Sequence, residues 1–267
     1  MFQTHQVDNL IYLTSDVLGS GVRHGFSTRK GGVSAGPLES LNLRGYIHGD
    51  KKENVEENYR RFCAVVGVNV QKVVLSQQEH QDHLRLVTAA DCGKGLWRER
   101  DYRAVDGLLC NTPGIPLVVF SADCNVILLH DPVHHAIAAV HAGWRGTALG
   151  IAAKAVREMH TQFGSDPTDI RAAIGPAIGK CCFETDDDVP RALRAALGEA
   201  AEPYMTQNGV KWHIDLKGIN ALWLQREGLT HIDTSDLCTM CRTDLFWSHR
   251  KLGNTRGVQA AVICLED

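Results

Sequence analysis

Three apolar runs in the middle of the chain are separated by connectors too short for a parallel arrangement. Residues 117–120, 126–130 and 135–140 are rich in Val, Leu, Ile and Ala, and only five and four residues separate them. Parallel neighbouring strands need a crossover of about a dozen residues or more. If these strands pair in sequence order, they therefore form an antiparallel meander.

Such a meander brings two reactive side chains to one edge of the sheet. Cys124 lies in the first connector, directly after Asp123, and His141 follows the third run. Because strand direction alternates, the first connector and the end of the third strand lie at the same edge. We therefore expect Cys124 and His141 to be close in space, although seventeen residues separate them in the sequence.

The segment that follows His141 has the composition of an anion-binding loop. His141-Ala-Gly-Trp-Arg-Gly146 leads into a helix that we predict from about Thr147 to Phe163, ended by Gly164. The free N–H groups and the dipole at a helix start favour an anion. Arg145 adds a guanidinium that can donate two parallel hydrogen bonds.

Helix and strand signals alternate along the remaining chain, and no linker or repeat divides it, so we predict one domain over residues 1–267. Capping and stop residues predict three further helices: one opened by Asp50 and Glu53 and ended by Gly67, one after Asp187 and Asp188 with Pro190 in its first turn, and one from Asp215 to Arg226 before Gly228. Apolar runs predict further strands at residues 73–75, 84–87, 107–110, 170–174 and 258–265.

Composition excludes several classes of protein. Hydrophobic residues make up 44% and charged residues 22%, which is typical of globular chains and not of disordered, coiled-coil or collagen-like ones. The net charge of −3 argues against a nucleic-acid partner. No apolar run reaches the roughly 18–20 residues that span a bilayer, and no secretory signal begins the chain. Nine cysteines cannot all pair internally. Since no export signal is present, we expect reduced thiols in a cytoplasmic protein, and the lack of a spanning run predicts no membrane partner.

Cys124 and His141 support two chemistries. They could form a nucleophile and base pair for acyl transfer, or they could be two ligands of a zinc ion that takes a third ligand elsewhere. Candidates for that third ligand are His80 and His83, in a polar segment between two predicted strands. The plain structural alternatives are a buried thiol, a core histidine and two solvated surface histidines.

Cys238-Thr-Met-Cys241 is a C-x-x-C motif, typical of a structural zinc half-site or a redox pair. A zinc site needs two more ligands, and the only other cysteine pair is Cys181-Cys182, whose adjacency makes an awkward chelate. A redox pair is expected near a βαβ pattern, which this sequence lacks. We therefore expect ordinary structural thiols and retention of zinc in a Cys238→Ala variant.

Two further patterns concern ligands. Residues 27–34, Ser-Thr-Arg-Lys-Gly-Gly-Val-Ser, are basic and glycine-rich but lack the spacing of a P-loop, so they form either an anion contact or an exposed turn.

A multicopper centre needs many converging histidines, and no His-x-His motif occurs among the thirteen histidines. Copper oxidase chemistry is therefore disfavoured.

With these residues laid out, the chain resembles the YfiH-type, or laccase-domain, family, which has been described both as multicopper polyphenol oxidase-like and as zinc-dependent purine nucleoside phosphorylases. The matching segments follow one another in the family's order over most of the chain. They are residues 27–34, Gln78-Glu-His80, Ala122-Asp-Cys124, residues 128–132, His141-Ala-Gly-Trp-Arg-Gly146, Ile174-Gly-Pro176, Phe246-Trp-Ser-His-Arg250 and Thr255-Arg256.

Matched by motif, the resemblance implies that His80, Cys124 and His141 bind the metal. It also implies an α+β fold in which two mixed β-sheets pack together and helices flank them. Three positions depart from the family pattern: Gln81 stands where glycine is usual, Val126 where proline is usual, and His249 where tyrosine is usual. Neither Gln81 nor Val126 removes a ligand, although both can alter the shape of the pocket.

The resemblance implies phosphorolysis of adenosine, inosine and methylthioadenosine, with adenosine deamination at the same zinc site, since zinc lowers the pKa of bound water. Nucleoside and phosphate are then the partners, and Arg29, Arg145 and Arg250 are the candidates for binding phosphate or substrate. Asp123 is the candidate for moving a proton or orienting a ligand.

Two other functions stay open at this point. The first is a Cys–His amide hydrolase that edits peptidoglycan precursors, with Cys124 as nucleophile and His141 as base. The second is a metal-binding module without catalysis.

Overall fold

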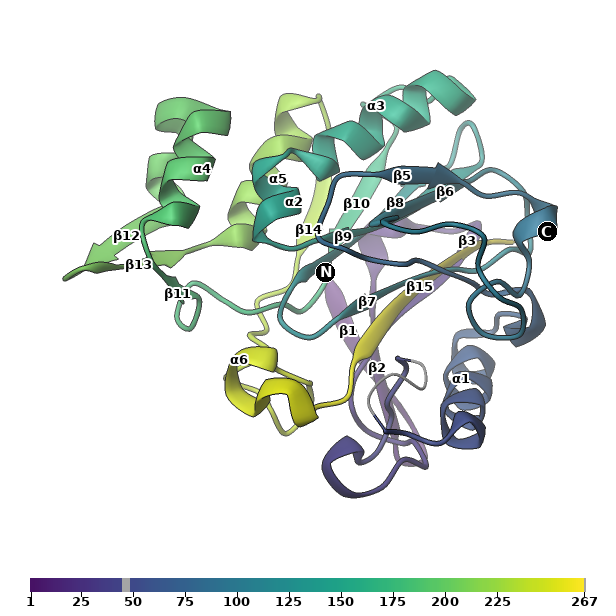
Figure 1. The fold of residues 1–267 in the computed structure, drawn as a ribbon. Helices are drawn as coiled ribbons and strands as arrows, with labels where there is room; N and C mark the ends of the chain where they lie inside the picture. Colours follow the sequence, from purple (N-terminus) through teal and green to yellow (C-terminus); the bar gives the residue numbers. More distant parts are fainter. Residues whose placement is uncertain (45–48, 267) are drawn as a thin grey trace.

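The strands form two six-stranded sheets that pack face to face (Figure 1). The structure is a computed structural model that describes residues 1–44 and 49–266. The first sheet runs, in spatial order, β1 (Phe2–Val7), β2 (Leu10–Ser15), β3 (Val22–Ser27), β15 (Gln259–Leu265), β7 (Leu117–Ser121) and β4 (Val74–Leu75). The second runs β14 (His231–Thr234), β10 (Arg171–Ile174), β8 (Asn125–Asp131), β9 (Ala136–Ala142), β6 (Gly107–Cys110) and β5 (Leu84–Leu86).

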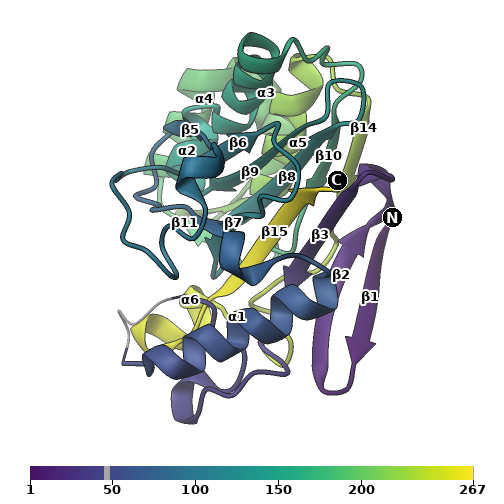
Figure 2. The same ribbon diagram turned by 90° about the vertical axis from the view of Figure 1, so that its right-hand side faces the viewer.

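Both sheets are mixed, because each contains antiparallel pairs and at least one parallel pair. In the first sheet β4 is parallel to β7, and in the second β5 is parallel to β6 and β14 to β10. Helices cover the outer faces: α1 (Lys52–Val66) packs on the first sheet, whereas α3 (Ile151–Phe163) and α5 (Leu216–Arg226) cover the second (Figure 2). The expected α+β fold of two packed mixed sheets flanked by helices is confirmed.

A third, smaller sheet extends beyond these layers and was not predicted. It consists of β11 (Glu184–Thr185), β13 (Lys211–Ile214) and β12 (Met205–Asn208), and it lies beside α4 (Asp188–Leu197) (Figure 1). Its strands are two to four residues long, and most of their residues are exposed or only partly buried, so they lack the apolar runs from which strands are predicted.

The central strands are apolar throughout because both of their faces are buried. In β8, Val126 and Leu128 face the first sheet, whereas Ile127 and Leu129 face the helices. The same alternation continues in β9, where Ile137 packs between the sheets. Burial on two sides therefore explains why these runs show no polar alternation.

The predicted meander is wrong at its first strand. β7 pairs with β15 and β4 in the first sheet, whereas β8 and β9 pair with each other in the second. Residues 122–124 carry the chain from one sheet to the other, which a short connector can do when the two sheets are packed face to face. The β8–β9 hairpin is antiparallel as expected, and it places Val126 opposite His141.

The predicted helix from Thr147 to Phe163 is two helices. The first, α2 (Trp144–Ala148), begins three residues earlier than expected, after Gly143. Gly150 then adopts a left-handed conformation with φ of 73°, which an α-helix does not contain, and α3 starts behind it. Arg145 consequently lies within the first turn of α2.

The other predicted elements agree with the structure within a few residues. The helix predicted after Asp50 begins at Lys52, with no side-chain cap, and ends at Gly67 as expected. Asp215 caps α5 by accepting a hydrogen bond from the Gly218 N–H. Among the described residues, no helix is long and apolar enough to cross a membrane.

The contact between the two sheets leads to a test at Gly175. A Cβ atom at Gly175 would lie 2.4 Å from the Phe26 ring and 3.1 Å from Val126 Cγ2. Gly175→Ala should therefore lower the free energy of unfolding by about 1–3 kcal/mol, measured by urea denaturation. Phe26→Leu removes the ring that a Cβ at residue 175 would meet. The double variant should therefore lose less stability than the sum of the losses in the two single variants. Strictly additive losses would contradict this packing.

Candidate functional site

One buried carboxylate organises the edge of the second sheet where the candidate metal ligands lie. Asp106, which directly precedes β6, is 0% exposed. Its side chain accepts hydrogen bonds from the backbone N–H groups of Glu79, His80 and Gln81 at 3.0, 3.0 and 3.1 Å. It also lies 2.8 Å from Nδ1 of His141. The same carboxylate therefore positions both histidines, one through its backbone and one through its ring.

The loop that carries His80 needs this support. His80 has a φ of 60°, a left-handed conformation that residues with a Cβ adopt at a cost. The three N–H groups donated to Asp106 hold the loop in that shape. His83, the alternative ligand in the sequence, lies apart and places its Nδ1 3.2 Å from the Ala104 carbonyl.

His80, Cys124 and His141 form a group that could hold a metal ion. One potential ligand atom from each residue lies within 4.8 Å of the others, and Cys124 Sγ is 3.8 Å from His80 Nε2. A sulfur and a nitrogen that share a tetrahedral zinc at 2.3 and 2.1 Å are about 3.6 Å apart. Because Asp106 occupies Nδ1 of His141, the Nε2 atom of that ring is left for a metal.

Gly143 leaves the space around these three side chains open. A Cβ atom at this position would lie 2.7 Å from the His80 ring, 3.3 Å from Cys124 Sγ and 3.7 Å from the His141 ring. The glycine before α2 is therefore required by a close approach of the backbone to the site.

The electrostatics favour a thiolate beside a charged imidazole. Burial by itself would raise the pKa of Cys124, but His141 and then His80 lower it to about 6. Burial would likewise lower the pKa of His141, whereas Cys124 and Asp106 raise it to about 9. Burial would raise the pKa of Asp106 as well, and the hydrogen bond with His141 and those from the backbone lower it. Metal binding needs the same thiolate.

The group opens into a pocket of about 320 Å³. Its walls combine aromatic and aliphatic side chains with two arginines, and the lining residues are His80, Ala122, Asp123, Cys124, Trp144, Arg145, Ile178, Phe183, Leu216, His249 and Arg250. A larger pocket, of about 770 Å³, lies along residues 95–103 and contains none of the three candidate ligands. We take the smaller pocket as the site because it borders the reactive groups.

The structure brings Arg145 and Arg250 into this pocket. Arg145 is exposed and its guanidinium stacks on Trp144, 4.2 Å from the ring centroid. Among the described residues, no carboxylate forms an ion pair with it. Arg250 belongs to α6 (His249–Leu252), and its guanidinium donates to the Glu184 carbonyl at 2.8 Å.

Arg29 is not brought to the pocket. Its guanidinium donates to the carbonyl oxygens of Glu39 at 2.9 Å and Thr243 at 3.0 Å, and it lies 3.8 Å from the ring centroid of Trp247. These contacts join the loop of residues 27–34 to the segment before α6. The basic loop therefore has a structural explanation that needs no anion.

Asp123 lines the pocket, but its two oxygens are engaged in structural hydrogen bonds. Oδ1 accepts from the Thr239 hydroxyl at 2.6 Å and Oδ2 from the Arg250 N–H at 2.7 Å. Its φ of 91° shows that these bonds hold a strained backbone. The carboxylate that orients His141 is Asp106, and Asp123 instead fixes the loops that form the pocket wall.

Arg256 is a second charged residue whose place the sequence did not reveal. It is partly buried, its Nε has no hydrogen-bond partner among the described atoms, and Asp123 and Cys124 interact with it electrostatically. Burial and the neighbouring Arg44 lower its pKa. Positive charge from two arginines and negative charge from Asp123 and Cys124 therefore meet beside the site.

The departures from the family pattern fall around this site. The Gln81 N–H donates to Asp106, so the residue type at this position leaves the backbone contact intact. Val126 is buried between the sheets, and His249 lines the pocket.

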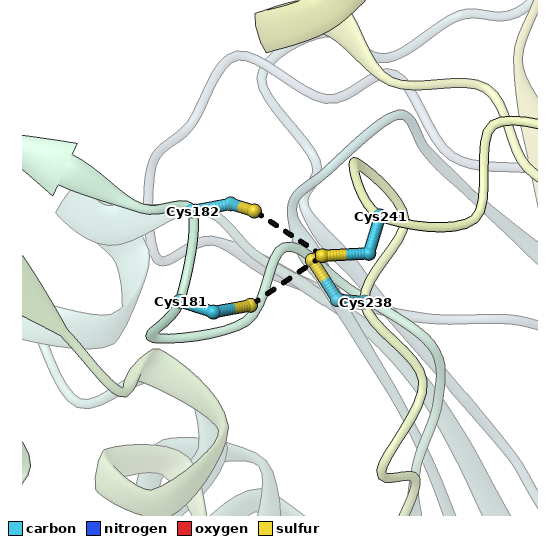
Figure 3. Close-up of side chains that lie close together, drawn as sticks. All are labelled: Cys181, Cys182, Cys238 and Cys241. Atoms are coloured by element: carbon cyan, nitrogen blue, oxygen red, sulfur yellow. Dashed lines mark hydrogen bonds between the residues drawn. The ribbon is translucent and has the colours of Figure 1, made fainter.

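The four cysteines expected to be ordinary thiols are gathered in one place. Cys181, Cys182, Cys238 and Cys241 bring their sulfur atoms within 4.8 Å of one another (Figure 3). The adjacency of Cys181 and Cys182 is less awkward than the sequence suggested, because a tight turn directs both of them toward the C-x-x-C loop. The Cys182 and Phe183 N–H groups both donate to the Gly179 carbonyl at 2.9 Å in that turn.

The chain is similar over most of its length to known proteins. The family model described as multi-copper polyphenol oxidoreductase laccase matches residues 23–266. The purine nucleoside phosphorylase YlmD of Bacillus subtilis is 37% identical over 234 residues, which cover 85% of this chain and 82% of the relative. The purine nucleoside phosphorylase YfiH of Escherichia coli is 34% identical over 245 residues, 92% of this chain and 94% of the relative.

Solved structures show the same fold. YlmD from Geobacillus stearothermophilus superimposes with a TM-score of 0.91 and 34% identity, covering 100% of this chain and 99% of the other. The hypothetical protein YfiH of Bacillus licheniformis superimposes with a TM-score of 0.92 and 32% identity, covering 98% and 99%. The chain therefore belongs to the YfiH-type, laccase-domain family, as its motifs predicted.

Proposed function

We propose that this chain is a zinc-dependent purine nucleoside phosphorylase that acts on adenosine, inosine and methylthioadenosine and also deaminates adenosine. The observation that carries the proposal is the group of His80, Cys124 and His141 at the base of a pocket that also holds two arginines. Relatives named purine nucleoside phosphorylase support it. We place the protein in the cytoplasm, where its thiols stay reduced.

The donor set fits zinc. One thiolate and two imidazoles bind zinc readily, and three protein ligands leave a fourth position open, as in catalytic sites. Within residues 1–44 and 49–266, neither of the two candidate metal groups contains more than two histidines, so a multicopper centre would lack ligands. A zinc ion held here would supply Lewis acidity to the substrate or to water.

The side chains of the pocket divide the remaining tasks. Asp106 holds His141 in one orientation through Nδ1 and keeps that ring fixed during turnover. Arg145 and Arg250 bind the phosphate oxygens, because a guanidinium donates two parallel hydrogen bonds to them. Arg256, which interacts electrostatically with Cys124, adds positive charge that attracts an anion to the site.

The nucleoside base binds against the apolar wall. Trp144 and Phe183 line the pocket together with Ile178 and Leu216. Aromatic faces bind a planar purine by stacking, and a volume of about 320 Å³ falls within the usual range of ligand pockets.

A Cys–His amide hydrolase is the second candidate, and one observation favours it. His141 lies between Cys124 and Asp106 in space and interacts with both side chains. A catalytic triad places its base between the nucleophile and an orienting carboxylate in the same way. Peptidoglycan precursors would be the amide substrates. A thiolate bound to zinc is a poor free nucleophile, so metal content separates the two functions.

The decisive assay incubates the metal-loaded protein with adenosine, with and without phosphate. Phosphate-dependent release of ribose 1-phosphate supports phosphorolysis, and inosine without phosphate supports deamination. No change in adenosine under either condition contradicts the proposal and directs attention to amide substrates.

Removal of the thiolate should empty the site. Cys124→Ala loses the only sulfur ligand, so metal analysis should find one zinc per chain fewer than in the unmodified protein, together with loss of phosphorolysis. Cys92→Ser, which changes a thiol outside both candidate groups, is the matched control and should keep its zinc. Unchanged zinc in Cys124→Ala would exclude this ligand set.

Asp106→Asn tests the carboxylate that positions both histidines. An amide cannot accept hydrogen bonds at both of its ends, so zinc should bind about 10–100-fold more weakly, measured by competition with a chelating dye. Asp91→Asn is the control, because Asp91 is equally buried but pairs with Arg85 and Lys94. It should destabilise the fold and leave zinc affinity unchanged; equal losses in both variants would show that Asp106 acts only on folding.

Arg145→Lys tests phosphate binding, because it keeps the charge and loses the two-pronged geometry. Loss of one charge-assisted hydrogen bond of about 1.5–3 kcal/mol should raise the KM for phosphate roughly tenfold to a hundredfold. Deamination, which needs no phosphate, should fall much less. Arg157→Lys on α3 serves as control, and an equal fall of both activities in Arg145→Lys would argue against a phosphate contact.

A further inference from the structure

Four cysteines outside the candidate active site have the arrangement of a second metal site. Cys181 and Cys182 lie in the turn between β10 and β11, and Cys238 and Cys241 lie in the loop between β14 and α6. Figure 3 shows all four sulfur atoms converging on one point from two loops. We propose that these thiolates bind a structural zinc ion, distinct from the metal at His80, Cys124 and His141.

The distances suit a tetrahedral ion. Cys241 Sγ lies 3.4 Å from Cys182 Sγ and 3.7 Å from Cys181 Sγ, and all four sulfurs lie within 4.8 Å of one another. Zinc–sulfur bonds of 2.3 Å in a tetrahedron separate the sulfurs by about 3.8 Å. The four cysteines are free thiols, and these separations are much longer than the roughly 2.05 Å of a disulfide bond.

The backbone around Cys238 favours a thiolate. The Gly179 N–H donates to Cys238 Sγ at 3.2 Å, and the N–H groups of Met240 and Cys241 also hydrogen-bond to this sulfur. A Cβ at Gly179 would lie 3.2 Å from Cys181 Sγ and 3.3 Å from Cys238 Cβ. Glycine therefore lets one loop approach the sulfurs of the other.

A buried cation lies beside the cluster. Lys217, on α5, is 7% exposed and interacts electrostatically with Cys238 and Cys181. Its ammonium group donates to the carbonyls of Ser235 and Leu237 in the loop that leads to Cys238. Four thiolates around a divalent ion carry a net charge of about −2, which a neighbouring ammonium offsets in part.

Four protein ligands leave no open position, so this ion is structural and not catalytic. The position of the four cysteines shows which loops the ion would stabilise. Cys182 precedes Phe183 in the pocket wall, and Thr239, inside the C-x-x-C motif, donates to Asp123. The ion would therefore fasten two loops that form the pocket, one on each side of the cluster.

The site is tested by counting zinc in five proteins prepared with zinc present. The unmodified chain should hold two ions, Cys241→Ser and Cys182→Ser one each, and Cys92→Ser two. Cys124→Ala should also hold one, and X-ray absorption of that variant should show only sulfur neighbours, at about 2.3 Å. Failure of the proposed nucleoside chemistry leaves these numbers unchanged, so the two claims fail separately.

Several results would overturn the assignment. They are full zinc content in Cys241→Ser, nitrogen neighbours or no metal in Cys124→Ala, iron in place of zinc, or a Cys182–Cys241 disulfide in the metal-free native protein.

A measurement on the unmodified chain covers the case in which the variants do not fold. Cys181 and Cys241 are exposed, so a thiol reagent should modify them slowly while zinc is bound and rapidly after chelation. Equal rates in both states would contradict a zinc site.

Discussion

The carboxylate of Asp106 is the interaction on which the candidate active site depends. It accepts three backbone N–H groups from the loop of His80 and contacts the ring of His141, and it is buried where water cannot replace these partners. A buried charge is stable only when it is fully hydrogen-bonded, and each of these bonds also fixes a reactive group. The hydrogen bonds that stabilise the buried charge of Asp106 therefore also position the His80 loop and the His141 ring.

The two packed sheets bring the other parts together. Residues 122–124 cross from the first sheet to the second, and the register of the β8–β9 hairpin then sets Cys124 beside His141. The loops that carry Phe183 and Thr239 come from the far edge of the second sheet and meet Asp123 at the same place. The pocket is therefore assembled from segments of both sheets, and its wall depends on the loops that hold the four cysteines.

The sequence predicted the local parts of this structure well. The apolar runs, the stop glycines and the proximity of Cys124 to His141 were readable because they depend on neighbouring residues and on a short hairpin. The same reasoning assigned β7 to the wrong sheet, since a short connector does not reveal whether a chain turns back or crosses to another layer. Asp106 was missed because its partners are 25 to 35 residues away in the sequence. The pairing of β6 with β9 brings His141 near it, whereas the pairing of β5 with β6 and the Gln77–Val105 bridge bring residues 79–81 near. The cysteine cluster was missed for a similar reason: adjacent cysteines make a poor chelate in an extended chain, but not in the tight turn at Gly179.

The most direct test of the account is a crystal structure of the zinc-loaded protein with anomalous scattering data collected on both sides of the zinc absorption edge. The account predicts a peak bounded by Nε2 of His80, Sγ of Cys124 and Nε2 of His141, with Nδ1 of His141 still bonded to Asp106. A zinc-replete crystal with no peak between these three residues, or with Asp106 itself binding the metal, would contradict it.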